Sequence, residues 1–367
     1  MPAIVEYYFP EYTPVLPSRY TDARRISEGG ATSIWTATDV QRGEDVVLKI
    51  PHVEDYKPYV LGKFTAEHDR TARFQHPNIV RAFDLDATAT EFTPYVAVEL
   101  VRGQTMNERL SSDGALDLGR VADVGAQLTD ALRTVHAADL VHRDINPDNV
   151  MITPDGQVKL IDFGNSSRTG DPEVELSVGT WGYAAPELAD ASNAIRNRRP
   201  NFEPPLPDPA TDVYGAGLTL HEAATGQVVF GAHGSRFAQA DGQVPRLSAV
   251  RDDVPPALDQ LIADMTAKDP GDRPTAAEAS VALRSIAAEL RAESTQSAPA
   301  AEAGPAQRVP DLDHLRSMLT AQPPAGQIMN RPATSAESAA SESSTPPRDH
   351  QSRQRQAGGA AQTPRID

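Results

Sequence analysis

Two short polar segments, each joined to a β-branched run, constrain the fold of this chain more than any other feature. They are VHRDINPDNVMI (141–152) and VKLIDFG (158–164). Asp144 and Asn149 lie in a loop that leads into one short strand, whereas Asp162 follows the next strand and precedes a glycine. The triplets HRD and DFG each occur by chance in ordinary loops, but their combination at this spacing is rare. Two carboxylates and an amide on adjacent loops suit Mg²⁺ that also binds phosphate oxygens.

Composition and charge exclude several classes of protein. The 367 residues carry 51 acidic and 34 basic side chains, a formal charge of −17. This charge argues against a nucleic-acid partner, because phosphate backbones require a dense basic face. The absence of cysteine excludes disulfides, thiolate metal sites and thiol nucleophiles. The N-terminus lacks the basic and apolar regions of a signal peptide, and no run approaches about 18 apolar residues. The sequence therefore predicts a cytoplasmic protein without a membrane partner.

The hydrophobic pattern predicts an α+β arrangement, with a small strand-rich part followed by a larger helical part. The β-branched runs at 46–50 and 95–100 predict strands, and the segment 64–74 between them predicts one helix. Apolar residues at helical spacing then predict a long helix over 118–138. Three further helices are predicted, after Asp212, over 255–268 and over 275–290.

The composition changes near residue 292, which divides the chain into a folded part and a tail. Residues 292–367 are rich in Ala, Ser, Pro, Gln and Thr, and such a segment buries too little apolar surface to offset its ordering entropy. We therefore expect a disordered tail there, after a domain at 20–291 and an N-terminal extension at 1–19. Leucines at helical spacing in 311–320 are consistent with either a transient helix or a docking helix for a partner.

These motifs resemble those of the bacterial eukaryotic-like serine/threonine protein kinases, and the resemblance extends from about Tyr20 to Leu290. It implies the bilobal protein-kinase fold, with a β-rich N-lobe at about 20–101 and a helical C-lobe at about 102–291. In that family HRD-x4-N is the catalytic loop, and DFG opens the activation segment.

The resemblance assigns roles to the polar residues of the two motifs and of the N-lobe. Asp144 would orient and deprotonate the substrate hydroxyl, and Asn149 and Asp162 would bind Mg²⁺ or Mn²⁺. Lys49 matches the strand lysine that contacts the α- and β-phosphates of ATP, and Glu67 matches its helix partner. Taken alone, a Lys and a Glu at this separation would be ordinary surface residues.

The resemblance also implies an ATP pocket between the lobes. Backbone groups of Glu99 and Val101 would bind the adenine edge. The side chains and glycines expected around the nucleotide are Ile26, Gly29, Gly30, Ile34, Val47 and Met151. The apolar members of this set could equally belong to a plain hydrophobic core, since both environments use the same side chains.

The end of the activation segment, SVGTWGYAAPE (177–187), favours a protein substrate. By resemblance, Arg273 would form an ion pair with Glu187, and Asp212 would accept hydrogen bonds from the catalytic-loop backbone. Small-molecule phosphotransferases of related fold lack the arrangement that joins APE to the arginine. The implied partners are therefore protein substrates, with autophosphorylation in cis or in trans as a further reaction.

Two departures from the family pattern bear on activity. Ser27 and Thr32 stand at the outer glycine positions of the phosphate loop, where bare backbone approaches the phosphates, so we expect weaker ATP affinity. Asn146 stands where the serine/threonine members carry a lysine whose charge meets the γ-phosphoryl group. Loss of that cation costs about 3–4 kcal/mol by analogy with one oxyanion-hole donor. The expectation is a slow kinase; the alternative is a pseudokinase that acts as a binding or scaffolding module.

Overall fold

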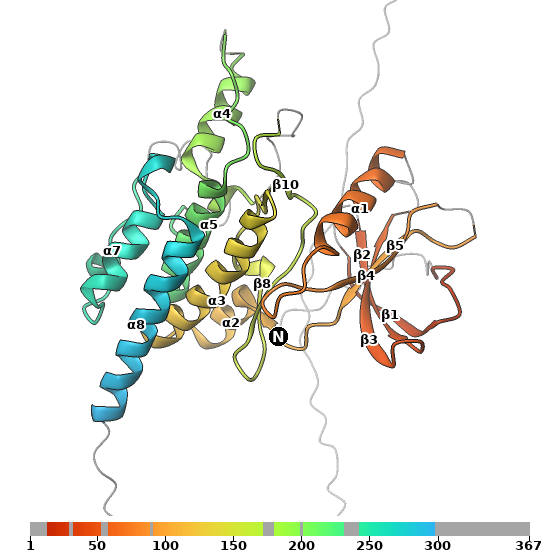
Figure 1. Cartoon of the computed structure of the whole chain (residues 1–367), viewed down its shortest axis with the longest axis horizontal. Coiled ribbons are helices and arrows are strands. Elements are labelled where there is room, and N and C mark those ends of the chain that lie inside the picture. The colour runs from red at the N-terminus through yellow and green to blue at the C-terminus, as the bar shows by residue number, and fades with distance from the viewer. Residues whose placement is uncertain are drawn as a thin grey trace, which may run out of the picture. The chain divides into compact units, whose positions relative to one another are not determined.

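The structure is a computed structural model that describes residues 13–28, 32–52, 58–88, 91–171, 180–198, 201–230 and 242–297. Its strands are β1 (Tyr20–Glu28), β2 (Thr32–Asp39), β3 (Glu44–Pro51), β4 (Ala82–Asp86), β5 (Tyr95–Glu99), β6 (Gln104–Thr105), β7 (Leu140–Val141), β8 (Val150–Ile152), β9 (Val158–Leu160) and β10 (Ser167–Arg168). Its helices are α1 (Pro58–Thr71), α2 (Met106–Asp113), α3 (Leu118–Ala137), α4 (Pro186–Arg196), α5 (Pro209–Thr225), α7 (Pro256–Met265) and α8 (Ala276–Ser297). The expected α+β fold, with a β-rich N-lobe and a helical C-lobe, is confirmed (Figure 1).

The N-lobe is built on an antiparallel sheet with the strand order β1-β2-β3-β5-β4. Successive side chains of a strand point to opposite faces, and β3 uses this alternation fully. Val46, Leu48 and Ile50 are completely buried in a cluster on one face. Val47 and Lys49 lie on the other face, where both line a cavity between the lobes. Because side chains alternate between the two faces of β3, burial of one set places the Lys49 side chain on the face that lines the cleft.

Helix α1 covers one side of this sheet and contacts β4 and β5 (Figure 1). It begins at Pro58 and ends at Thr71, whereas the sequence predicts a helix over 64–74. Proline is accepted in the first helical turn because its missing N–H has no intrahelical partner there. At the other end, the Phe74 N–H donates to the Thr71 carbonyl in a turn, which ends the helix early.

The C-lobe core forms where α3 packs against α5 and α8. The predicted helix over 118–138 is confirmed as α3, whose apolar face is buried. Asp117 caps this helix, because its side chain accepts a hydrogen bond from the Arg120 N–H at 2.9 Å. Helix α5 is buried along almost its whole length, so it serves as the scaffold for the loops that pack on it.

One close approach ties α5 to the loop that carries Asp144. A Cβ atom added to Gly215 would lie 2.8 Å from the Ile145 carbonyl oxygen, which is closer than real Cβ contacts come. Glycine at this position therefore lets the first half of α5 lie directly against the loop backbone.

The later helices follow the predicted pattern, with shifted ends. The predicted helix over 255–268 is confirmed as α7, and α8 continues through Ser297, past the expected domain boundary at 291. Residues 298–367 and most of the extension at 1–19 lie outside the described residues, so the tail and the leucine pattern at 311–320 stay predictions.

Within the described ranges, no helix has the length and apolarity needed to cross a membrane.

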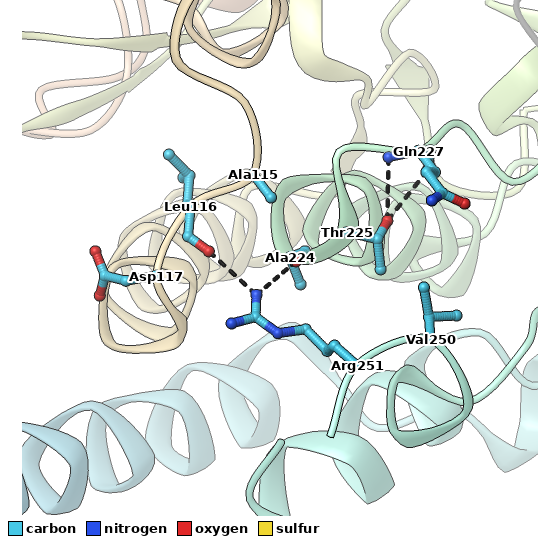
Figure 2. Close-up of a pocket in the computed structure, with 8 residues that line it drawn as sticks. All are labelled: Ala115, Leu116, Asp117, Ala224, Thr225, Gln227, Val250 and Arg251. Carbon is cyan, nitrogen blue, oxygen red and sulfur yellow. Dashed lines mark hydrogen bonds between the residues drawn. The ribbon is translucent and has the colours of Figure 1, made fainter. Parts of the chain in front are cut away.

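A cavity of about 410 Å³ in the C-lobe lies beside an arginine that joins two elements (Figure 2). Arg251 Nη1 donates to the carbonyl oxygens of Ala224, at 2.6 Å, and of Leu116, at 3.3 Å. Ala224 belongs to the last turn of α5, where carbonyl groups have no partner within the helix. Arg251 thus satisfies the end of α5 and ties it to the segment before α3.

Replacement of Arg251 by alanine should lower the free energy of unfolding by about 1–3 kcal/mol, because two carbonyl groups lose a charged donor. Urea unfolding followed by circular dichroism measures this change. The matched control is Asp253→Asn, which weakens only the ion pair between Arg251 and the exposed Asp253 and should lower the free energy of unfolding much less. Equal effects of the two substitutions would contradict the role of the carbonyl contacts.

Candidate active site

A cavity of about 590 Å³ lies between the N-lobe sheet and the β8–β9 hairpin. Of the positions expected around a nucleotide, those lining it are Ile26, Ile34, Val47, Lys49, Glu99, Val101 and Met151. Gly29 and Gly30 lie outside the described residues. Apolar side chains from β2 and β3 and from β8 line the cavity from the two lobes, an arrangement that suits a flat aromatic base between them.

The segment that joins the lobes closes one edge of the cavity. Glu99 ends β5, and its carboxylate accepts hydrogen bonds from Lys159 Nζ at 3.0 Å and from the Arg81 N–H at 3.1 Å. A Cβ atom added to Gly103 would lie only 2.4 Å from the Ile152 carbonyl oxygen. Glycine is therefore required where the joining segment passes β8.

Lys49 forms the expected ion pair with Glu67 and also contacts Asp162. Lys49 Nζ lies 2.5 Å from Glu67 Oε1 and 3.1 Å from Asp162 Oδ1. Burial acts to lower the pKa of Lys49, but the two carboxylates outweigh it and raise that pKa above its ordinary value. Lys49 in turn holds the pKa of Asp162 below its usual range. Lys49 and Asp162 are therefore both charged at neutral pH, as binding of phosphate and metal requires.

Asp212 supports the loop that carries Asp144. Its carboxylate accepts hydrogen bonds from the backbone N–H groups of His142, at 2.8 Å, and Arg143, at 2.7 Å, which confirms the predicted role. His136 Nε2 donates to the same carboxylate at 2.9 Å. Burial alone would raise the pKa of Asp212, but the hydrogen bond from His136 and the nearby imidazole groups lower it. The N–H donors hold the loop in place while Arg143 adopts a φ of 69°.

The carboxylate of Asp144 accepts three hydrogen bonds within the described part of the chain. Its Oδ1 accepts from Asn146 Nδ2 at 2.8 Å and from the Thr180 N–H at 2.9 Å. Its Oδ2 accepts from Asn165 Nδ2 at 3.1 Å. The carboxylate is thus oriented by the catalytic loop itself, by the residue after DFG and by the end of the activation segment.

Asn146 uses both ends of its side-chain amide. Its Oδ1 accepts from the Asp148 N–H at 2.9 Å and caps the short turn at 147–149, while its Nδ2 also donates to Thr180 Oγ1 at 3.1 Å. The residue is only 2% exposed. A lysine could donate to Asp144 and Thr180 but has no acceptor for the Asp148 N–H.

Asn149 and Asp162 fit the role of metal ligands by their chemistry and placement. The Ile161 N–H donates to the Asn149 carbonyl at 3.0 Å, so the backbones of the two loops are joined next to Asp162. Asn149 Nδ2 donates to the Asp144 carbonyl at 2.8 Å, which fixes the orientation of the amide. No group of three or more His, Asp or Glu side chains in the described ranges could hold a metal ion by itself. Two oxygen ligands completed by phosphate match the coordination of a hard divalent cation.

The end of the activation segment is anchored to the C-lobe by the expected ion pair. Arg273 Nη1 and Nη2 lie 2.9 Å and 2.8 Å from the two carboxylate oxygens of Glu187. The Arg273 side chain is completely buried. The Tyr183 hydroxyl donates to Glu222, whose pKa burial raises above its ordinary value. Residues 172–179 lie outside the described residues.

The comparisons with known proteins agree with this geometry. A family model described as "Protein kinase domain" matches residues 20–282. The chain belongs to the protein kinase family. Its relatives include serine/threonine-protein kinase PknL of Mycobacterium tuberculosis, 33% identical over 286 residues that cover 75% of this chain and 67% of PknL. Another is serine/threonine-protein kinase PknA of the same organism, 33% identical, with 70% of this chain and 58% of PknA covered. The family uses ATP with a divalent metal and acts on proteins.

Some residues of this kinase cleft were not expected from its sequence. Thr105 and Glu108 line the cavity at the start of α2, where they form a capping box. Their spacing, T-x-x-E before a helix, is a recognisable signal that could have placed them. Asn165 contacts Asp144, and nothing in the local pattern indicated that contact, because it depends on how two loops meet.

Proposed function

We propose that this chain transfers the γ-phosphate of ATP to serine and threonine hydroxyl groups of proteins, including its own. The observation that carries the proposal is the network in one cleft of Lys49, Glu67 and Asp162, next to an oriented Asp144. We further propose that residues 20–291 are the kinase domain, with lobes at about 20–101 and 102–291.

The residues of the cleft divide the work of phosphoryl transfer. Lys49, held by Glu67, binds the α- and β-phosphates, and the segment from Glu99 to Val101 binds the adenine edge. Asn149 and Asp162 hold Mg²⁺ or Mn²⁺, which neutralises charge on the phosphates. Asp144 orients the substrate hydroxyl and accepts its proton. This reaction asks mainly for positioning and charge neutralisation, and these groups supply both.

The rival function is a pseudokinase, favoured by Ser27, Thr32 and Asn146. The contacts of Asn146 support an active enzyme instead, since its Nδ2 donates to both Asp144 Oδ1 and Thr180 Oγ1. The substitution therefore removes a positive charge and retains the connection between the catalytic aspartate and the activation segment. We propose slow but genuine turnover.

The test is phosphate transfer from γ-labelled Mg-ATP to the protein itself and to a generic basic protein, repeated with Mn²⁺. Asp144→Asn serves as the negative control. Phosphate incorporation that occurs with the wild type and is absent with Asp144→Asn supports a kinase. Label that is absent from the wild type but present in Asn146→Lys identifies a module disabled at one residue. Wild-type protein that binds Mg-ATP without labelling any protein would support the scaffold instead.

Substitution of Asn146 by lysine should raise kcat by roughly 30- to 150-fold, because a cation then meets the γ-phosphoryl group. The gain is smaller than the about 3–4 kcal/mol expected from the cation alone. The lysine cannot accept the hydrogen bond from the Asp148 N–H, and the loss of this capping interaction costs about 1 kcal/mol. Initial rates at saturating ATP measure this change. Asn146→Ala is the control and should lower kcat, because it removes the amide without adding a charge. A rate for Asn146→Lys at or below that of Asn146→Ala would contradict the prediction.

A further inference from the structure

We propose that Asn165 is a positioning residue for the catalytic base, and that it directs Oδ2 of Asp144 to receive the substrate proton. The proposal rests on the kinase activity proposed above. It adds a residue to the site and assigns the proton transfer to one oxygen atom.

The argument begins with the acceptor capacity of the Asp144 carboxylate. Each carboxylate oxygen offers about two lone-pair positions. Oδ1 accepts from Asn146 Nδ2 and from the Thr180 N–H, at 2.8 and 2.9 Å, so both of its positions are used. Oδ2 accepts only from Asn165 Nδ2, at 3.1 Å, among the residues that the structure describes. One position remains, and it is on Oδ2.

The hydrogen bond from Asn165 fixes the direction of that remaining position. Once one lone pair of Oδ2 is committed and Oδ1 is held by two donors, the carboxylate plane cannot rotate without losing a bond to an ionised group. Such bonds are worth more than those between neutral groups. The substrate hydroxyl therefore meets an acceptor of defined orientation. Its proton passes to Oδ2 as its oxygen bonds to the γ-phosphorus, and the bond between that phosphorus and the β,γ-bridging oxygen breaks, so that ADP leaves.

Asn165 is itself held on a turn that is joined to both loops of the site. Its backbone carbonyl accepts from Arg143 Nη1 at 3.4 Å. Next to it, Ser166 bonds the Phe163 carbonyl through its N–H, at 3.1 Å, and its hydroxyl, at 2.6 Å. Phe163 is 1% exposed and packs against His142 with ring centroids 4.8 Å apart. The amide thus projects from a turn anchored in the core.

Asn165 connects the catalytic base to the metal-binding loop. Gly164, the residue before it, donates its N–H to Asp162 Oδ1 at 3.1 Å. A displacement of the 162–165 turn would therefore move the metal ligand and the donor to Asp144 together. In a chain that has a neutral amide at position 146, this second amide supplies the orientation of the oxygen that Asn146 does not touch.

The test compares Asn165→Ala and Asn165→Asp with the wild type. Loss of one hydrogen bond to a charged group should lower kcat about 10- to 100-fold, with KM for ATP changed less than about twofold. Asn165→Asp has the same shape but replaces the donor by an acceptor, so it should lower kcat further than alanine does. Asn107→Ala is the matched control, because it removes an amide-to-carboxylate bond of 2.8 Å on Asp148 without touching Asp144.

The outcomes separate this inference from the proposed function. Wild-type transfer with unchanged kcat in Asn165→Ala, or a smaller loss in Asn165→Asp than in Asn165→Ala, would overturn the positioning role alone. Absence of Asp144-dependent transfer in the wild type would overturn the proposed function. In that case amide hydrogen exchange of residues 142–146, which do not include the Asp148 partner of Asn107, decides the inference. Faster exchange in Asn165→Ala than in Asn107→Ala supports it, and equal exchange overturns it.

Discussion

Replacement of Asp144 by asparagine is expected to lower kcat by about 10²- to 10⁴-fold, the range for loss of a positioned proton acceptor. Asparagine can keep its oxygen toward Asn146 and the Thr180 N–H, the two donors that Oδ1 accepts in the wild type. Its NH₂ group then takes the place of Oδ2. The substrate hydroxyl would meet a donor where it needs an acceptor, so the loss should fall on kcat.

Nucleotide binding and stability provide the controls for this variant. Among the described residues, no hydrogen bond or ion pair joins the Asp144 side chain to Lys49, Glu67 or Asp162. The Kd for Mg-ADP, measured by calorimetry, should therefore change less than about threefold. Asp155→Asn, in the exposed turn between β8 and β9, should retain wild-type kcat. A kcat for Asp144→Asn within tenfold of the wild type would mean that the proton is accepted elsewhere.

The second large effect is on stability. Arg273→Leu should lower the free energy of unfolding by about 3–5 kcal/mol, because it leaves the Glu187 carboxylate without its buried partner. The arginine also donates to the carbonyls of Ala267, Lys268 and Ala210, at 2.8, 3.1 and 3.0 Å. In a domain of this size the loss corresponds to a fall in Tm of roughly 10 °C.

Two further variants distinguish the contribution of the buried ion pair to stability from that of an exposed ion pair and from that of the hydrogen bonds to the carbonyl groups. Arg284→Leu removes an exposed ion pair with Asp130 and should cost less than about 1 kcal/mol. The double variant Arg273→Leu with Glu187→Leu should recover only part of the loss, since the carbonyl groups remain without donors. Thermal unfolding should therefore show the largest loss of stability for Arg273→Leu, a smaller loss for the double variant and the smallest loss for Arg284→Leu. An effect of Arg273→Leu no larger than that of Arg284→Leu would show that the buried pair does not anchor the segment.

Local sequence patterns predicted the structure correctly where one hydrophobic period determines which face of a strand or which stretch of a helix is buried. The alternation of β3 places Val47 and Lys49 on one face and their neighbours on the other, and apolar spacing defines α3 within a residue of its observed end. The ends of α1 were predicted less well, because the apolar pattern of 64–74 does not reveal that Pro58 can open the helix or that a turn at Thr71 ends it.

The sequence by itself predicted which groups carry the chemistry, and it was sufficient to place the chain in the protein kinase family. Asp144, Asn149 and Asp162 lie in short motifs whose residue types are set by metal and phosphate chemistry. Only the tertiary structure decided what orients these groups. Asn165 reaches Asp144, and His136 reaches Asp212, through contacts between residues distant in the chain. Such contacts arise from the packing of α5 and of two loops against each other, and no local period encodes them.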